Sequence, residues 1–184
     1  MVFRSVGDDM ENIIYEINGP VVKVKNAQNF SMLEKVFVGP KKLMGEVISI
    51  SSEETVIQVY ETTTGLKCGD IVYPTGGLVS VTLGPGILKN IFDGIQRPLV
   101  TIANKEGAFI AAGSDAFPLD LQKEWDVKIL VKEGQKLHSG EVYAEVQETE
   151  SIVHKIMVPP YVNGKVLKAK KDGKHKVDEE IVTL

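Results

Sequence analysis

Residues 43–60 read LMGEVISISSEETVIQVY, and this stretch decides the fold class of the chain. Residues 43–50 are rich in β-branched and other apolar side chains, which favour a strand. Residues 55–60 alternate between apolar and polar, as a half-buried strand does. The intervening SSEE contains no apolar residue and marks a turn. The stretch therefore predicts two antiparallel strands of an all-β protein.

The same pattern extends toward the N-terminus. Further strand-like runs precede and follow the opening stretch, separated by the turn signals NGP and GPKK. Strands are predicted at 13–17, 21–25 and 35–38, within 65–76, and at 78–83. Short strands at such close spacing predict a small β-barrel domain over residues 13–83, preceded by a tail at 1–12.

A second β domain is predicted from Trp125 onward. The strand-like runs here are 125–131, 141–146, 152–158, 165–170 and 180–184, with a turn at 171–174. Between the two domains, five apolar residues recur at helical spacing, and Gly94 and Arg97-Pro98 end the pattern. These residues are Ile87, Leu88, Ile91, Phe92 and Ile95. We expect one or two helical turns there, then an extended linker over 99–115.

Composition narrows the function classes. The net charge is -4, which argues against nucleic acid as the main partner, because phosphate binding needs a basic face. The basic stretch at 168–176 has no interleaved aromatic residue for base stacking, so it is predicted to be a solvated sheet edge and turn. A lone cysteine, Cys68, forms no internal disulfide and favours a reducing compartment. No apolar run approaches the roughly 18 residues of a membrane span, so no direct membrane insertion is expected.

A search for catalytic motifs predicts no active site in this chain. Lys165 and Lys174 each follow a glycine, but neither precedes the Ser or Thr that a phosphate loop needs. His138, His154 and His175 do not stand at metal-ligand spacing with Cys68 or with carboxylates. The carboxylates at 148 and 150 flank Thr149 and are predicted to be solvated. No catalytic, cofactor-binding or metal-binding residue is therefore predicted.

Residues 131–184 resemble the β-sandwich of biotinyl and lipoyl carrier domains. Such a carrier needs a lysine at a hairpin tip, and the lipoyl version reads Glu-Thr-Asp-Lys-Ala there. This chain reads Glu-Thr-Glu-Ser at 148–151, so Ser151 stands where the lysine should be. The biotinyl Met-Lys-Met is also absent, since residues 154–157 read HKIM. The resemblance implies the fold without the carrier function, and Lys155 is the attachment point that an unusual carrier would use.

A wider resemblance covers residues 13–184. LGPGILKNIFDGIQRPL at 83–99 resembles the signature ahead of the bulge insertion in the catalytic A subunit of V-type and archaeal-type rotary ATPases. The runs at 17–24 (INGPVVKV), 45–70 and 117–120 (FPLD), and the long run at 123–160 that ends in HKIMVPP, are similar to that family in the same order. We call residues 84–98 the signature segment and residues 116–184 the bulge domain. The positions that match the family signature are Gly84, Pro85, Gly86, Ile91, Phe92, Asp93, Gly94, Gln96, Arg97 and Pro98.

The resemblance implies a role in a larger enzyme. In this family the N-terminal barrel joins a ring of alternating A and B subunits, and the bulge domain contacts peripheral-stalk or neighbouring subunits. The site for ATP and Mg²⁺ is expected beyond Leu184, so this chain alone should be inactive as an ATP hydrolase or synthase. The parent complex would move protons or sodium ions, with this part in the cytoplasm at the membrane periphery.

The resemblance also raises the question of what covers the signature segment. Its apolar residues Ile87, Leu88, Ile91 and Phe92 would pack on the ATP-binding domain. Without that domain, we expect them either to form an exposed patch or to rest on the bulge domain.

Three alternative functions remain open from the sequence. The first is a freestanding interaction module built from both β domains. The second is a carrier that lacks the usual lysine, and the third is a nucleic-acid-binding barrel.

Overall fold

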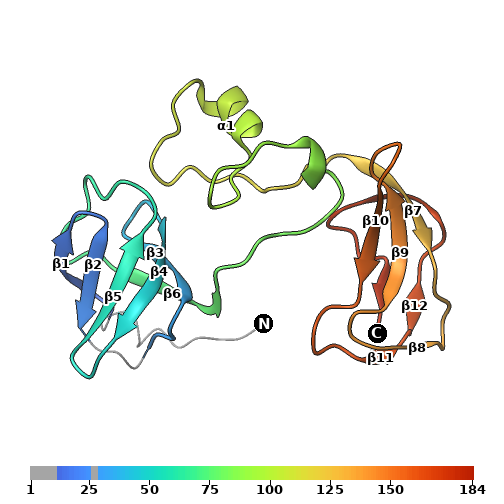
Figure 1. The fold of residues 1–184 in the computed structure, drawn as a ribbon, viewed down its shortest axis with the longest axis horizontal. Helices are drawn as coiled ribbons and strands as arrows, with labels where there is room; N and C mark the ends of the chain where they lie inside the picture. The colour runs from blue at the N-terminus through green and yellow to red at the C-terminus, as the bar shows by residue number, and fades with distance from the viewer. Residues whose placement is uncertain (1–11, 26–28) are drawn as a thin grey trace. The chain divides into compact units, whose positions relative to one another are not determined.

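The computed structural model describes residues 12–25 and 29–184, which form two compact units (Figure 1). The first unit comprises the described residues up to Val81 together with Ile102–Asp115. The second comprises Thr82–Thr101 and Ala116–Leu184. The predicted tail lies outside the described residues except for Asn12, which is buried.

The first unit is built on a six-stranded antiparallel sheet of order β1-β2-β5-β4-β3-β6. Its strands are β1 (Ile14–Asn18), β2 (Val21–Lys25), β3 (Glu34–Val38), β4 (Leu43–Ile50), β5 (Glu54–Val59) and β6 (Val72–Leu78). The sheet curls until its edges meet at an isolated bridge between Ile13 and Ile71, and the amide of Ile14 donates to Asp70 O at 2.9 Å. The all-β prediction is confirmed.

Alternation along the strands produces the core of the first unit. Valines at every second position of β2 and β3 point inward and are fully buried, as the pleat requires. The buried cluster consists of Ile14, Val22, Val24, Phe30, Val36, Val38, Leu43, Val47, Ile57, Val59 and Val72.

One predicted strand of the first half is wrong. The run at 78–83 is not a separate strand, because β6 ends at Leu78 and residues 79–84 pair with no strand among residues 12–25 and 29–184. Its apolar side chains are solvated instead of packed, with Val81 62% and Leu83 73% exposed. Alternation alone does not show whether a partner strand is present to pair with the run.

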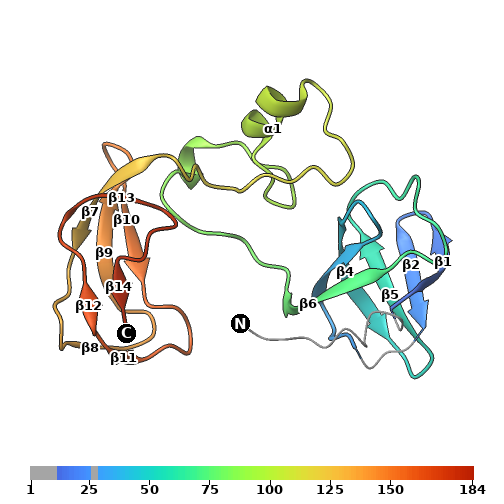
Figure 2. The same cartoon turned by 180° about the vertical axis from the view of Figure 1, so that it is seen from behind.

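The second unit contains a four-stranded antiparallel sheet of order β10-β9-β7-β13 and two short two-stranded sheets, β11-β8 and β12-β14 (Figure 2). The strands are β7 (Glu124–Ile129), β8 (Lys136–Leu137), β9 (Val142–Gln147), β10 (Val153–Met157), β11 (Gly164–Lys165), β12 (Lys168–Ala169), β13 (Gly173–Lys176) and β14 (Val182–Thr183). The predicted strand at 165–170 is therefore split in two, and the predicted turn at 171–174 contains the start of β13.

Two apolar clusters fill the second unit. One contains Trp125, Val127, Ala144 and Val146, which come from the central strands β7 and β9. The other contains Val131, Leu137, Val158 and Val166. Ile129 and Tyr143 pack against both clusters, so a continuous core supports the sheet.

The region between the predicted domains holds two helices. A single 3-10 turn, η1 (Ile87–Lys89), replaces the one or two helical turns predicted there. The linker predicted over 99–115 is wrong in its first half, which forms α1 (Leu99–Glu106). Pro98 precedes this helix and Gly107 follows it with φ +92°, its amide donating to Ala103 O at 2.9 Å. Proline before a helix and glycine after it are favourable at both ends, so Pro98 marks a start as well as a stop.

Candidate functional site

The signature segment lies within the second unit and is closed by the side chain of Gln96. The Gln96 amide imitates a peptide group. Its Nε2 donates to Thr82 O at 2.7 Å, and its Oε1 accepts from Thr82 N at 2.6 Å. Gln96 has φ +63°, a left-handed conformation that is costly for a residue with a side chain. The paired hydrogen bonds offset that cost and join the C-terminal part of the segment to Thr82, two residues before its start.

Asp93 forms hydrogen bonds within the signature segment. Its Oδ1 accepts from the amides of Ile95 and Arg97, and Arg97 Nε donates to Oδ2 at 2.7 Å. Burial by itself raises the pKa of Asp93, but the hydrogen bonds from Arg97 and Ile95 and the Arg97 charge outweigh it and lower the pKa. An isolated bridge between Phe92 and Pro98 completes the loop. Asp93, Gln96 and Arg97 therefore shape the backbone of the segment.

The glycines at the start of the segment lie in close contact with apolar side chains. A Cβ on Gly84 would lie 2.5 Å from Leu119 Cδ1. A Cβ on Gly86 would lie 3.2 Å from the Trp125 ring, and Gly86 has φ +104°. Leu119 and Trp125 belong to the bulge domain, so the Gly84–Gly86 backbone rests directly on it.

Glu148 holds this backbone in place. It directly follows β9, and its Oε1 accepts hydrogen bonds from the amides of Gly86 at 2.7 Å and Leu88 at 3.1 Å. Its Oε2 lies 3.4 Å from Nδ1 of His154 on β10, and its side chain is fully buried. The prediction that Glu148 is solvated is wrong, whereas Glu150 is exposed as predicted. Glu148 lies in the run at 123–160 that resembles the family, but no neighbouring residue in the sequence predicts that it is buried.

The four apolar residues of the segment differ in exposure, and two of them fit the expected exposed patch. Leu88 and Ile91 are 54% and 63% exposed and form a solvated edge. Ile87 and Phe92 are half-buried. Among the other signature positions, Pro98 is buried, Pro85 is half-buried and Gly94 is exposed with nothing near its Cβ position.

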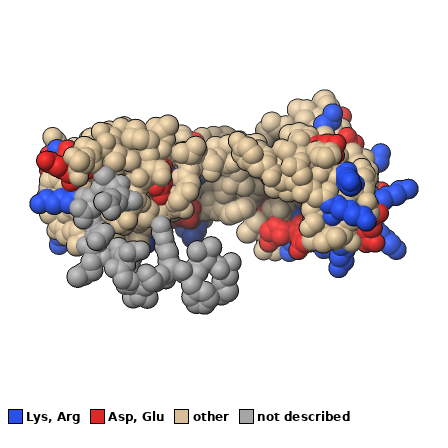
Figure 3. Space-filling model, turned by 90° about the horizontal axis from the view of Figure 1, so that it is seen from below, with Lys and Arg blue, Asp and Glu red and all other residues tan. Residues whose placement is uncertain are grey.

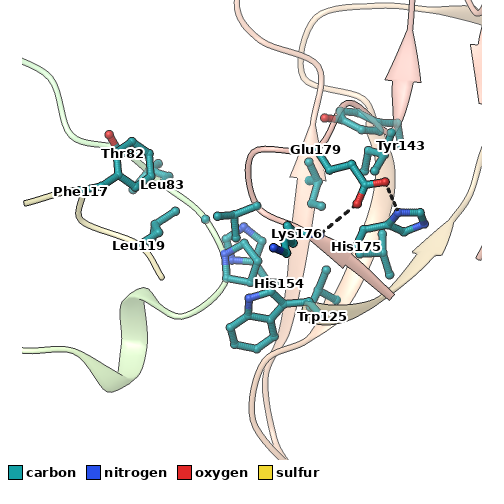
Figure 4. Close-up of a pocket in the computed structure, with 17 residues that line it drawn as sticks. Thr82, Leu83, Phe117, Leu119, Trp125, Tyr143, His154, His175, Lys176 and Glu179 are labelled. Atoms are coloured by element: carbon teal, nitrogen blue, oxygen red, sulfur yellow. Dashed lines mark hydrogen bonds and ion pairs between the residues drawn. The ribbon is translucent and has the colours of Figure 1, made fainter. Parts of the chain in front are cut away.

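A cavity of about 280 Å³ lies beside the segment in the second unit (Figure 4). Apolar side chains such as Leu119 and Ile156 supply much of its wall. The lining also includes His154 and the pair of His175 and Glu179, which a dashed line joins in Figure 4. Trp125 also lines the cavity, and its buried indole Nε1 has no hydrogen-bond partner among the residues that the structure describes.

An ion cluster borders this cavity. His175 Nδ1 lies 3.1 Å from Glu179 Oε1, which Lys170 Nζ also contacts, and His175 Nε2 lies 3.0 Å from Lys171 O. Lys170 and then His175 lower the pKa of Glu179 to about 2. The Lys171 carbonyl and the Glu179 carboxylate raise the pKa of His175. Each charge thus has a partner, which is typical of a structural cluster.

The basic stretch 168–176 lies on β12, β13 and the turn between them. Figure 3 shows Lys and Arg side chains gathered on the second unit. Within the stretch Lys168, Lys171 and Lys174 are exposed, and Lys174 stands opposite Asp126 on β7. The stretch is therefore a sheet edge and turn with charged side chains in solvent, as predicted.

The hairpin β9–β10 has no lysine at its tip, where a carrier domain attaches its cofactor. Ser151 lies in its tip, and Lys155 lies in the middle of β10 opposite Glu145 of β9. In the part of the chain that the structure describes, no three metal-ligating side chains gather in one place. Nor does any helix of those residues have the length and apolarity to cross a membrane.

Comparisons with known proteins agree with this architecture. Residues 14–76 match the family model described as "ATP synthase alpha/beta family, beta-barrel domain". Residues 116–184 match the one described as "ATPsynthase alpha/beta subunit barrel-sandwich domain". The two matched ranges lie in the first and second structural units respectively.

Curated relatives match along nearly the whole chain. It is 51% identical over 177 residues to the V-type ATP synthase alpha chain 2 of Clostridium tetani, and 48% over 176 residues to the V-type ATP synthase alpha chain of Halothermothrix orenii. It is 45% identical over 179 residues to the A subunit of the A-type ATP synthase of Methanopyrus kandleri. These matches cover 96%, 96% and 97% of this chain but 30% of each relative. The chain therefore belongs to the ATP synthase alpha/beta family and corresponds to the β-barrel and barrel-sandwich domains that the V-type alpha chain and the A-type A subunit share with it.

Proposed function

We propose that this chain is the non-catalytic N-terminal part of the A subunit of an ion-translocating V-type or A-type ATPase. The observation that carries the proposal is the 51% identity that covers 96% of this chain and 30% of an ATP synthase alpha chain. In this role the β-barrel joins the A subunit to B subunits, and the bulge domain meets peripheral-stalk or neighbouring subunits.

The proposed parent subunit binds ATP and Mg²⁺ outside these residues. The printed sequence contains no G-x-x-x-x-G-K-[ST], the loop that cradles phosphates in such enzymes. This chain alone is then a structural part that does not hydrolyse ATP, located at the membrane periphery on the cytoplasmic side. The parent complex couples ATP synthesis or hydrolysis to the movement of protons or sodium ions.

The exposed edge of the signature segment is our candidate for the contact with the ATP-binding domain. Leu88 and Ile91 are more than half exposed, and Leu83 just before them is 73% exposed. Apolar side chains that cluster in sequence and remain solvated are typical of an interface.

The first test is the mass of the native polypeptide, detected in source cells with an antibody against residues 116–184. The chain itself has a mass of 20.2 kDa, and its match fills 30% of the relative, so we expect a band about three times heavier. Peptides from that band should contain a phosphate loop. A native band at 20.2 kDa would contradict the proposal and favour a freestanding interaction module.

The second test is the double variant Leu88→Asp/Ile91→Asp in the intact subunit. Because both side chains are exposed, the N-terminal part should still fold, while assembly and ATP hydrolysis of the complex should fall. Leu167→Asp is the matched control, since Leu167 is 66% exposed on the bulge domain. Full activity of the double variant would remove the segment from the proposed contact.

A further inference from the structure

The buried carboxylate of Glu148 is the feature that the proposed function leaves unexplained. Its side chain is fully buried, two residues after Val146 of the apolar cluster that contains Trp125. Burial of a carboxylate is costly unless hydrogen bonds or an opposite charge compensate for it, and an apolar side chain of similar size often packs at lower cost. The presence of a buried carboxylate at this position is therefore not explained by the stability of the core.

The hydrogen bonds of Glu148 supply an explanation. Both amides that donate to its Oε1, those of Gly86 and Leu88, lie about sixty residues earlier in the chain, at separations of 62 and 60. They belong to the signature segment, whereas Glu148 belongs to the bulge-domain hairpin. That hairpin end is itself fixed, because Glu148 N donates to Ile152 O at 3.0 Å. The carboxylate thus links two stretches that the sequence separates widely.

Packing reinforces the link from a second direction. The Trp125 ring lies against the Cα of Gly86, and Leu119 lies against that of Gly84. Glu148 therefore draws the backbone toward the domain at the same place where the two glycines allow close approach. Thr82–Thr101 accordingly belongs to the same compact unit as Ala116–Leu184.

We infer that Glu148 is a positioning residue that locks the signature segment to the bulge domain, so that the two move as one body. A partner that displaces the bulge domain of the proposed parent subunit then displaces the segment with it. That consequence rests on the proposed function. The lock itself rests only on contacts within this chain, so its test can fail without affecting the proposal above.

Hydrogen exchange on the 184-residue chain tests the lock. Glu148→Met keeps an unbranched side chain of similar length but removes both acceptor oxygens. We expect the amides of residues 84–90 to exchange about 10-fold to 100-fold faster, while the β9–β10 amides keep their protection. Glu148→Gln keeps one acceptor and loses the charge, so its rates should lie between those of the wild type and Glu148→Met.

Glu150→Met is the matched control, because Glu150 lies in the same hairpin tip and is exposed. Unchanged exchange at 84–90 in Glu148→Met, or equal acceleration in Glu150→Met, overturns the inference. If the β9–β10 amides of Glu148→Met also lose protection against exchange, Gly86→Ala is the second variant that tests the inference. Its Cβ would press on Trp125 and lift the segment while the carboxylate stays in place. Acceleration confined to 84–90 in that variant supports the lock, and unchanged rates there overturn it.

Discussion

At the scale of single residues, two buried carboxylates connect backbone stretches that are distant in the sequence. Glu34 in the first unit accepts from Ser31 N at 2.8 Å and from Gly76 N at 2.6 Å, which ties β3 to the end of β6. Glu148 does the same for the signature segment and the bulge domain. In small β domains with little core, such charge-assisted bonds hold backbone where the strand ladder is irregular, as beside Glu34, or absent, as at Gly86.

The cluster of His175, Glu179 and Lys170 predicts how the stability of the second unit depends on pH. The folded-state pKa of His175 is raised above the usual 6.5. The contribution of His175 to the free energy of unfolding is therefore complete below pH 6.5 and is lost as the pH rises through the raised pKa. The pKa of Glu179 is lowered from 4.5 to about 2, so its contribution is complete above pH 4.5 and is lost as the pH falls toward 2. Both contributions are therefore complete between pH 4.5 and pH 6.5.

Urea unfolding, followed by the fluorescence of the one tryptophan, Trp125, measures this dependence. The free energy of unfolding should be higher at about pH 5.5 than at about pH 8.5. His175→Gln should reduce the difference, because it removes the imidazole whose pKa is raised in the folded state. An equal difference in wild type and variant would contradict the assignment to His175.

Gly45 in β4 predicts a steric effect at one residue. A Cβ there would lie 2.8 Å from Gln58 O and 3.1 Å from Ile57 Cγ2. Gly45→Ala should therefore lower the free energy of unfolding of the first unit by about 1–3 kcal/mol, the usual cost of overpacking. Far-UV circular dichroism during urea unfolding measures the change. Gly77→Ala in β6 is the control, since nothing lies within 4 Å of its Cβ position, and an equal loss there would refute the steric explanation.

At the scale of elements, the signature segment is held by side chains that replace a regular hydrogen-bond ladder. Gln96 closes it, Asp93 and Arg97 brace it, and η1 contributes a single turn. Most of these groups are polar and partly solvated, so the segment should open locally before the sheet beside it unfolds.

The Gln96 closure predicts a graded response to substitution. Gln96→Ala removes both amide bonds to Thr82 and keeps a Cβ at φ +63°, whereas Gln96→Gly removes the bonds but relieves the left-handed strain. Tryptic cleavage after the exposed Lys89 reports opening of the segment. We expect cleavage to be slowest in the wild type, faster in Gln96→Gly and fastest in Gln96→Ala. Equal rates in all three proteins would show that the amide does not close the segment.

At the scale of the whole molecule, the chain consists of two units with separate cores. The apolar cluster of the first unit is supplied by β1 to β6 with Phe30, and those of the second are supplied by residues from Trp125 onward. Each unit therefore has the means to unfold by its own transition.

Separate cores predict that damage to one unit leaves the other unchanged. Gly45→Ala should shift the circular dichroism transition of the first unit while the Trp125 fluorescence midpoint stays the same. Conversely, Val146→Ala, which removes fully buried volume beside Trp125, should shift the fluorescence midpoint, with a loss of about 1–3 kcal/mol. A common shift of both signals in either variant would show that the units unfold together.

The family and most of the longer strands could be predicted from the sequence alone. Alternation in β2 and β5 and the turn signals between strands are local, so they can be read without a structure, and the family-like runs are long enough to align almost the whole chain. The folded structure was needed to show that Glu148 is buried, that Gly84 and Gly86 rest on Leu119 and Trp125, and that the run after Leu78 pairs with no strand of the described residues. Each of these depends on contact between residues far apart along the chain, and local pattern carries no information about such contacts. The prediction missed α1 for a local reason. Pro98 is compatible both with the end of one element and with the start of the next.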